Sequence, residues 1–195
     1  LPPSLPPPLP PSRGHFLTPQ AGQRCVPEAR RYCAPASKMS VSPYRCRKHE
    51  AQGFTHYVNG ENDGWMRSDD GQEFFATASE MKVVASMAVT PAWLADLRMV
   101  AKANPTVPFL LHHMGMPKNT GSGHDQSEVH EILECAKVPN IGVKISGFNY
   151  NNSKKFDFPY SQSQALFHEI YKAFGPRRIF WASDFPASRD MLTYT

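Results

Sequence analysis

The sequence predicts an α/β protein built on a parallel β-sheet, and three observations support this fold class. From Gly53 onward, strand-like and helix-like segments alternate strictly along the chain, which favours a parallel sheet. The strand-like segments are continuous apolar runs, as is typical of strands that are covered on both faces. Polar side chains follow the strand ends, where parallel α/β proteins gather their functional residues.

Periodicity and helix-end signals define the individual elements. Ser68 and Thr90 are suited to cap the first two expected helices, and Pro91 fits the first position of the second. Gly175 fits the residue that stops the last helix. The apolar run from Ile179 to Ala182 predicts that the last strand is buried. We expect strands over residues 53–59, 83–88, 107–115, 141–147 and 178–186, and helices over residues 68–82, 90–104, 127–140 and 161–175.

Two architectures fit this alternation, a doubly wound open sheet and a (β/α)8 barrel. No GxGxxG or GxxxxGK motif follows any of the expected strands, which disfavours the nucleotide-binding forms of the open sheet. The short run GSG at residues 121–123 does not amount to such a motif.

The first 50 residues differ from the rest of the chain. They open with LPPSLPPPLPPS, and proline is excluded from helix interiors and central strands. We therefore expect residues 1–50 to form a disordered, Pro-rich segment and residues 51–195 to form the folded domain. An SH3 or WW domain would bind such a segment as a polyproline II helix. Because the chain begins with Leu, an artefact of the gene model is an alternative explanation of this segment.

Composition narrows the class of protein only slightly. The 195 residues carry a formal net charge of +4, and 41% of them are hydrophobic, as in ordinary globular domains. No apolar run of membrane-spanning length and no signal peptide occur in the sequence. The four cysteines form no CxxC pair, so we expect reduced thiols in a cytoplasmic protein. We expect a small-molecule substrate and neither a nucleic acid nor a membrane partner, while the oligomeric state is not indicated.

Candidate functional residues stand at the ends of the expected strands. Because side chains alternate along a strand, we expect His112 and His113 to point to opposite sides, so that at most one of them faces a barrel interior. Lys144 and Ser146 share one face, and in an interior Lys144 would need a carboxylate partner or a substrate anion. Taken alone, a histidine at a strand end is equally well explained by a structural hydrogen bond. Asp184, taken alone, is equally well explained as a turn residue. The set comprises Asn59, His112, His113, Lys144, Ser146 and Asp184.

Three segments resemble the amidohydrolase-related family. They are VPFLLHHMGMP (107–117), PNIGVKISGFNY (139–150) and AFGPRRIFWASDFPASRD (173–190). The family patterns are His-[Leu/Met]-Gly on strand six, Val-Lys-[Leu/Ile]-Ser-Gly on strand seven, and Phe-Gly-x-x-Arg-[hydrophobic]-x-Trp-[Gly/Ala]-Ser-Asp-[aromatic]-Pro through strand eight. The last pattern is the most specific, and here it runs from Phe174 to Pro186. The resemblance extends from about Gly53 to Thr195.

The resemblance implies a partial (β/α)8 TIM barrel, about strands 4 to 8, from a hydrolase, lactonase or decarboxylase. It implies that Asp184 takes a proton from the attacking water and that His113 polarises the substrate carbonyl or binds metal. It also implies a divalent metal ion at His113 and Asp184, with Zn²⁺ as the first candidate, which would make bound water more acidic. We expect Lys144, Ser146 and Asn149, the last in the loop 148–160, to bind substrate.

The chain also departs from the family pattern. The His-x-His that metal-dependent members carry on strand one is absent, and the strand-five position of a family histidine holds Met87 and Ala88. Counting back from strand eight makes residues 53–59 strand four, so strands one to three and helix eight are not found. We therefore expect a truncated chain that is inactive by itself. The alternatives are a non-enzymatic fragment or interaction protein with a partner-binding Pro-rich leader, and an unrelated open α/β enzyme.

Overall fold

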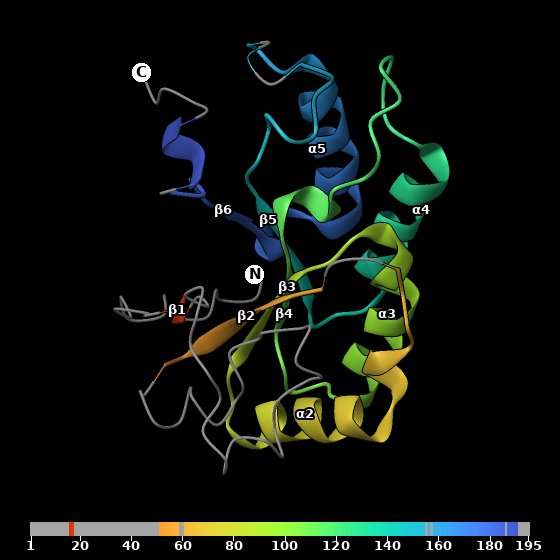
Figure 1. Ribbon diagram of the computed structural model, residues 1–195, viewed down its shortest axis with the longest axis vertical. Helices are drawn as coiled ribbons and strands as arrows, with labels where there is room; N and C mark the ends of the chain where they lie inside the picture. The colour runs from red at the N-terminus through yellow and green to blue at the C-terminus, as the bar shows by residue number, and fades with distance from the viewer. Residues whose placement is uncertain are drawn as a thin grey trace, which may run out of the picture.

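The computed structural model describes residues 16–17, 51–58, 61–154, 156, 158–185 and 187–190 (Figure 1). Apart from residues 16 and 17, the segment 1–50 lies outside the described residues, as does Asn59. The disorder predicted for residues 1–50 and the domain boundary at residue 51 therefore stay predictions.

The described strands form one six-stranded parallel sheet in the order β1-β2-β3-β4-β5-β6. Because this order follows the chain, each crossover places its helix on the same face of the sheet. Figure 1 shows the helices α2 to α5 along one side of the strands. A doubly wound sheet needs a reversal of strand order, which is not found among the described strands. The fold is thus α/β and consistent with a partial TIM barrel, as the sequence predicted. The strands are β1 (Phe16–Leu17), β2 (Gly53–Tyr57), β3 (Val84–Ala88), β4 (Phe109–Leu111), β5 (Ile141–Ile145) and β6 (Ile179–Trp181).

Each helix follows a local signal in the sequence. The helices are α2 (Asp69–Glu80), α3 (Leu94–Ala103), α4 (Gln126–Glu134) and α5 (Ser161–Phe174), with 3-10 turns at Trp65–Arg67, Pro91–Trp93, His113–Gly115, Cys135–Lys137, Pro176–Arg178 and Ala187–Asp190. The Ser68 side chain caps α2 by accepting a hydrogen bond from Gly71 N at 3.2 Å, as predicted. Gly175 ends α5 with a φ of 69°, also as predicted. Thr90 makes no side-chain cap, because Pro91 begins a 3-10 turn before α3 starts at Leu94.

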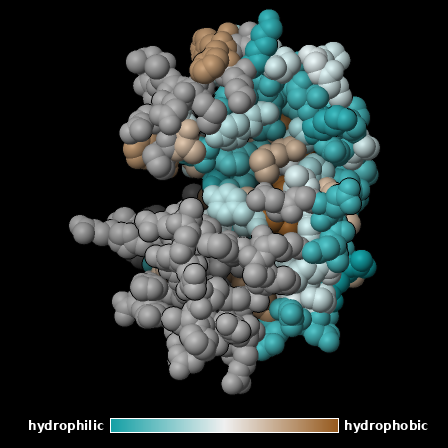
Figure 2. Space-filling model, viewed as in Figure 1, coloured by the Kyte–Doolittle hydropathy of each residue, from teal (hydrophilic) through white to brown (hydrophobic). Residues whose placement is uncertain are grey.

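The hydrophobic core lies between the sheet and its helices. Phe54 on β2 meets Phe74 of α2 edge to face, with ring centroids 5.2 Å apart. Phe109 on β4 packs on Phe75 of α2 at 5.5 Å. Toward solvent the helices present mostly hydrophilic residues, which Figure 2 shows over the side of the molecule formed by α3 and α4. No helix of the described residues is long and apolar enough to cross a membrane.

Three strands differ from the sequence-based expectation. β1, which pairs with β2 through Phe16 and Leu17, was not predicted, because two residues give no periodicity. β4 ends at Leu111 rather than continuing to residue 115, since the chain turns at His113. The last strand was predicted to be buried, but Phe180 is 50% and Trp181 75% exposed. The reason is that β6 is an edge strand of the sheet and pairs with β5 alone among the described strands.

Candidate active site

The two histidines after β4 both reach one region, contrary to the expectation from alternation. His112 has an extended backbone, whereas His113 has a left-handed φ of 47° and begins a 3-10 turn. Strand alternation therefore does not extend to His113. The two rings lie with centroids 5.3 Å apart and nearly perpendicular. Both histidines are thus placed at the carboxyl end of β4, where parallel α/β proteins carry their functional groups.

His113 is held by contacts with two segments of the β5 loop. Its Nδ1 lies 2.9 Å from Ser146 Oγ, and the edge of its ring meets Tyr150 with centroids 5.1 Å apart. Its backbone carbonyl accepts a hydrogen bond from Asn151 Nδ2 at 2.9 Å. The side chain is 12% exposed. These contacts leave Nε2 as the ring nitrogen that faces Asp184.

Asp184 follows β6 and turns its carboxylate toward His113. Its φ of 58° is left-handed, which aspartate tolerates better than most residues. Oδ1 lies 3.8 Å from His113 Nε2, and Oδ2 accepts a hydrogen bond from the Tyr150 hydroxyl at 2.8 Å. The side chain is 21% exposed, so a small molecule can reach it. The carboxylate therefore sits against another strand end instead of serving only the local turn.

A second cluster of polar side chains, formed by His112, Ser86 and Lys144, lies beside the cluster around His113, on the sheet face opposite the helices. His112 Nε2 is 2.5 Å from Ser86 Oγ on β3 and 3.2 Å from Lys144 Nζ on β5. His112 is 3% exposed, and no hydrogen-bond partner of its Nδ1 is found in the described part of the chain. Of the predicted residues, Lys144 thus contacts His112, and Ser146, on the same strand face, contacts His113.

The structure brings His113, Asp184, Ser146 and Lys144 together, and their roles stay predictions. Asn149 is 2% exposed in the loop after β5, and its role in substrate binding also stays a prediction. Tyr150 was missed. Its signal was present in the resemblance segment, where an aromatic residue follows the strand-seven pattern by three positions.

A family sequence model described as Amidohydrolase matches residues 12–194. The chain belongs to the amidohydrolase family. The match begins well before Gly53, so the family pattern covers most of the segment that the sequence analysis took for a leader.

Solved amidohydrolase structures have the same fold. One is an amidohydrolase from Burkholderia multivorans with bound HEPES, which is 20% identical with a TM-score of 0.66, and the match covers 77% of this chain and 57% of that chain. The Burkholderia protein with bound Zn is 20% identical with a TM-score of 0.64, and the match covers 79% of this chain and 58% of that chain. A probable 2-pyrone-4,6-dicarboxylic acid hydrolase from Acinetobacter baumannii with citric acid bound is 18% identical with a TM-score of 0.63, and the match covers 77% of this chain and 56% of that chain. This chain therefore spans less than two thirds of the length of these proteins. The search of curated proteins gave no match.

Burial and charge set the protonation of the basic groups in this amidohydrolase. Burial, together with the charges of Lys144 and His113, lowers the pKa of His112 to about 2. Burial also lowers the pKa of His113, an effect that Asp184 opposes and Lys144 reinforces. The pKa of Lys144 is lowered by burial, and the Asp184 carboxylate opposes that shift. Both histidines are accordingly neutral imidazoles at neutral pH.

The described residues of this amidohydrolase do not complete a zinc site. His113 Nε2 and Asp184 Oδ1, 3.8 Å apart, are close enough to share one ion. Catalytic zinc is held by three protein ligands, and no third His, Cys, Asp or Glu of the described residues completes such a group. The donor set described here is therefore incomplete for zinc, and the reaction steps proposed below use protein groups alone.

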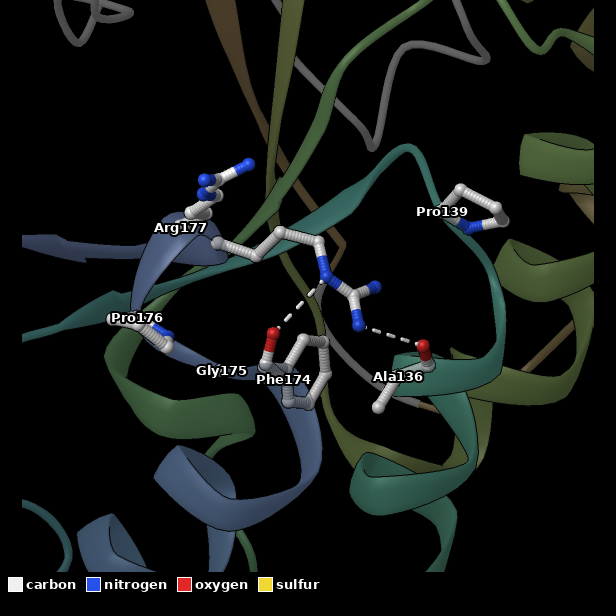
Figure 3. Close-up of a pocket in the computed structure, with 7 residues that line it drawn as sticks. Ala136, Pro139, Phe174, Gly175, Pro176 and Arg177 are labelled. Atoms are coloured by element: carbon white, nitrogen blue, oxygen red, sulfur yellow. Dashed lines mark hydrogen bonds between the residues drawn. The ribbon is translucent and has the colours of Figure 1, made fainter. Parts of the chain in front are cut away.

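A pocket of about 530 Å³ lies at the opposite end of the strands, near the starts of β5 and β6 (Figure 3). It is lined by Ala136, Pro139 and the segment 174–178, and Figure 3 shows Arg177 extending away from it. The Arg178 guanidinium donates to the carbonyl oxygens of Phe174 at 3.2 Å and Ala136 at 2.9 Å. These structural hydrogen bonds occupy the donors of the Arg178 guanidinium. The pocket lies at the other end of the strands from His113 and Asp184. The pocket therefore does not include the polar side chains at the carboxyl ends of the strands.

Proposed function

We propose that this amidohydrolase hydrolyses a small carbonyl compound, a lactone or an amide, with Asp184 as the general base. The observation that supports this most is the convergence of His113, Tyr150 and Asp184, which follow β4, β5 and β6 respectively. A carboxylate next to a neutral imidazole at the strand ends is suited to acid–base chemistry on a carbonyl group.

Asp184 would accept a proton from the attacking water. The Tyr150 hydroxyl donates to Oδ2 and fixes the carboxylate plane, which leaves Oδ1 directed toward His113 as the proton acceptor. As water adds to the carbonyl carbon, its proton passes to Asp184. When the C–O or C–N bond breaks, the same proton is returned to the leaving alkoxide or amine.

His113 would polarise the substrate carbonyl. In this proposal Ser146 Oγ, 2.9 Å from Nδ1, donates to that nitrogen, so that the ring proton lies on Nε2, the nitrogen that faces Asp184. Since burial lowers the pKa of His113, the ring remains a neutral donor at neutral pH. Its Nε2–H would stabilise the negative charge that develops on the carbonyl oxygen.

The proposal also includes a divalent metal ion, with Zn²⁺ as the first candidate. In a metal-bound form His113 Nε2 and Asp184 Oδ1 would be the two ligands that the described residues contribute, with the ring proton on Nδ1 instead of Nε2. Such an ion polarises a carbonyl group and acidifies water. We also propose that the 195-residue chain alone is inactive, because the solved amidohydrolases that it resembles are longer.

The test is an assay of the longest protein that the gene encodes, on a panel of lactones and amides and on a decarboxylation substrate, with and without Zn²⁺. We expect Asp184→Asn to lower kcat about 10³-fold, within the range of general base catalysis. Asp125→Asn is the matched control, because Asp125 caps α4 and asparagine caps equally well. An Asp184→Asn enzyme with more than a tenth of the wild-type kcat would refute the proposal.

A further inference from the structure

Two of the groups that meet Asp184 lie in different loops, outside the sheet. His113 lies in the turn after β4 and has a left-handed φ of 47°. Tyr150 lies in the loop after β5, where its backbone N–H donates to Gly147 O at 2.9 Å. The paired residues of β4 and β5 end before both loops, so the register of the sheet does not fix one loop against the other. Their relative position depends on contacts between the loops themselves.

The side-chain amide of Asn151 makes such a contact. Its Nδ2 donates to His113 O at 2.9 Å and to Gly147 O at 3.2 Å. One amide group therefore joins the turn that carries His113 to the turn that carries Tyr150. Because both acceptors are carbonyl oxygens, the atom that faces them is the amide nitrogen, and its two N–H donors match the two carbonyls.

The backbone of Asn151 holds the far end of the loop after β4. His124 Nε2 donates to the Asn151 carbonyl oxygen at 2.6 Å, so the chain from His113 to His124 is tied at both ends to one residue. Asn151 is 1% exposed, and water does not compete for these bonds. Its Oδ1 has no hydrogen-bond partner among the described residues, and an unpaired buried acceptor lowers stability. The contribution of this side chain therefore lies in what its nitrogen holds.

We propose that Asn151 is a positioning residue, which holds the loops after β4 and β5 in the one arrangement that brings His113 and Tyr150 together at Asp184. This inference rests on the proposed function for the roles of those three groups. The Asn151 amide fixes at once the 3.8 Å separation of His113 Nε2 from Asp184 Oδ1 and the bond from the Tyr150 hydroxyl to Oδ2. A misplacement of about 1 Å at a reacting group can cost on the order of 10²-fold in rate. Because Asn151 is buried, kcat rather than KM should respond to its loss.

Asn140 has the same chemistry at the opposite end of β5 and provides a matched control. Its Nδ2 donates to three backbone carbonyl oxygens, those of Ala101 at 3.0 Å, Asn104 at 3.0 Å and Val107 at 2.9 Å. These carbonyls lie at the end of α3 and in the segment before β4, whereas His113 follows β4. Removing the Asn140 amide therefore costs the fold hydrogen bonds of the same kind and leaves the loops around Asp184 in place.

The test compares Asn151→Ala with Asn140→Ala in the protein used for the activity assay. Asn151→Ala should lower kcat about tenfold or more with KM nearly unchanged, and Asn140→Ala should change neither. A nitrogen NMR spectrum of the histidine rings supplies a readout that does not depend on turnover, and the His113 signals are identified by their absence from His113→Gln. Asn151→Ala should shift these signals, and Asn140→Ala should not.

Asn151→Asp provides a second variant, with circular dichroism as the check that each variant folds. It keeps the shape of the side chain but turns an acceptor toward the carbonyls of His113 and Gly147, so the loss of kcat should be at least as large as with alanine. An unchanged kcat in both Asn151 variants would overturn the proposal, as would His113 signals that neither variant shifts. Equal losses of kcat for Asn151→Ala and Asn140→Ala would also overturn it, because the effect would then be one of overall stability.

The outcome for Asn151 is separable from that for the proposed general base. If Asp184→Asn is inactive while both Asn151 variants keep the wild-type kcat, only the positioning role of Asn151 fails. If Asp184→Asn is active while Asn151→Ala lowers kcat and shifts the His113 signals, the general base fails and the positioning of His113 by Asn151 is supported.

Discussion

The face of the sheet that packs on the helices and the face opposite to it differ in how fully their side chains are matched. On the helix side, Phe54, Phe109 and Leu111 are almost completely buried in apolar contacts. On the opposite side, His112 and Lys144 form a polar pair, and burial lowers the pKa of both side chains. Burying polar groups such as His112 and Lys144 costs free energy. The burial of the aromatic residues on the helix side offsets that cost.

This contrast indicates that one face holds the fold together, and it supports the proposal that the other face carries the reacting groups. Left-handed backbone at the non-glycine residues His113 and Asp184 occurs at the ends of β4 and β6. Backbone of this kind is retained where the surrounding structure over-determines it, as active sites commonly do. Substitutions on the two faces should therefore differ in the sign and size of their effects.

The largest stability effect is expected on the helix side. Phe75 is fully buried and contacts Trp65, Phe74 and Phe109, with centroid distances of 5.2 to 5.9 Å. Phe75→Ala should lower the free energy of unfolding by about 3–5 kcal/mol, because it leaves a cavity that helix and sheet cannot close. Urea denaturation followed by circular dichroism measures this change.

The same substitution on the other face provides the control. Phe180 on β6 is 50% exposed, and Phe180→Ala should cost less than about 1 kcal/mol. Equal losses for Phe75→Ala and Phe180→Ala would contradict the division of roles between the two faces.

A smaller effect, on activity alone, is expected at Tyr150. Tyr150→Phe removes the hydroxyl that donates to Asp184 Oδ2 at 2.8 Å but keeps the ring that meets His113. If Tyr150 positions the carboxylate, kcat should fall about tenfold, or about 1.4 kcal/mol, with KM nearly unchanged. Steady-state kinetics on the preferred substrate would show this, and Tyr171→Phe, 45% exposed on α5, should have no effect. A change in KM without a change in kcat would instead indicate substrate binding by Tyr150.

The sequence predicted the helix-packed face well because local signals determine it. Apolar periodicity located α2 to α5, and Ser68 and Gly175 mark ends that depend on neighbouring backbone alone. Motif positions also placed His113 and Asp184 at strand ends. Such features need no knowledge of distant contacts.

The remaining features arise from tertiary contacts. The turn at His113 is supported by the Asn151 side chain, 38 residues further along the chain. A side chain at Gly147 would meet the Tyr150 ring and His113 Nδ1, so this glycine permits the close approach that sequence periodicity does not reveal. Likewise, the exposure of Phe180 and Trp181 is decided by which strands flank β6, and their apolar composition carries no such information.

The smallest effect is expected at Lys144, and its sign is opposite to that at Phe75. Since burial lowers the pKa of Lys144, its charge opposes folding at neutral pH. Lys144→Met should therefore raise the free energy of unfolding and the melting temperature only slightly, because the side chain is partly exposed and solvent screens its charge. The unfolded chain binds more protons than the folded one between the lowered pKa and the ordinary value near 10.4, so wild-type stability rises with pH across that window. The advantage of the variant should consequently shrink as the pH approaches and passes about 10.4.

Because Asp184, His112 and Tyr57 share this environment, the quantity to follow is the difference between variant and wild type in the free energy of urea unfolding from pH 7 to pH 10.5. A variant less stable than wild type at pH 7 would show that Lys144 stabilises the fold, and the distinction between the two faces would then fail at the residue where it is sharpest.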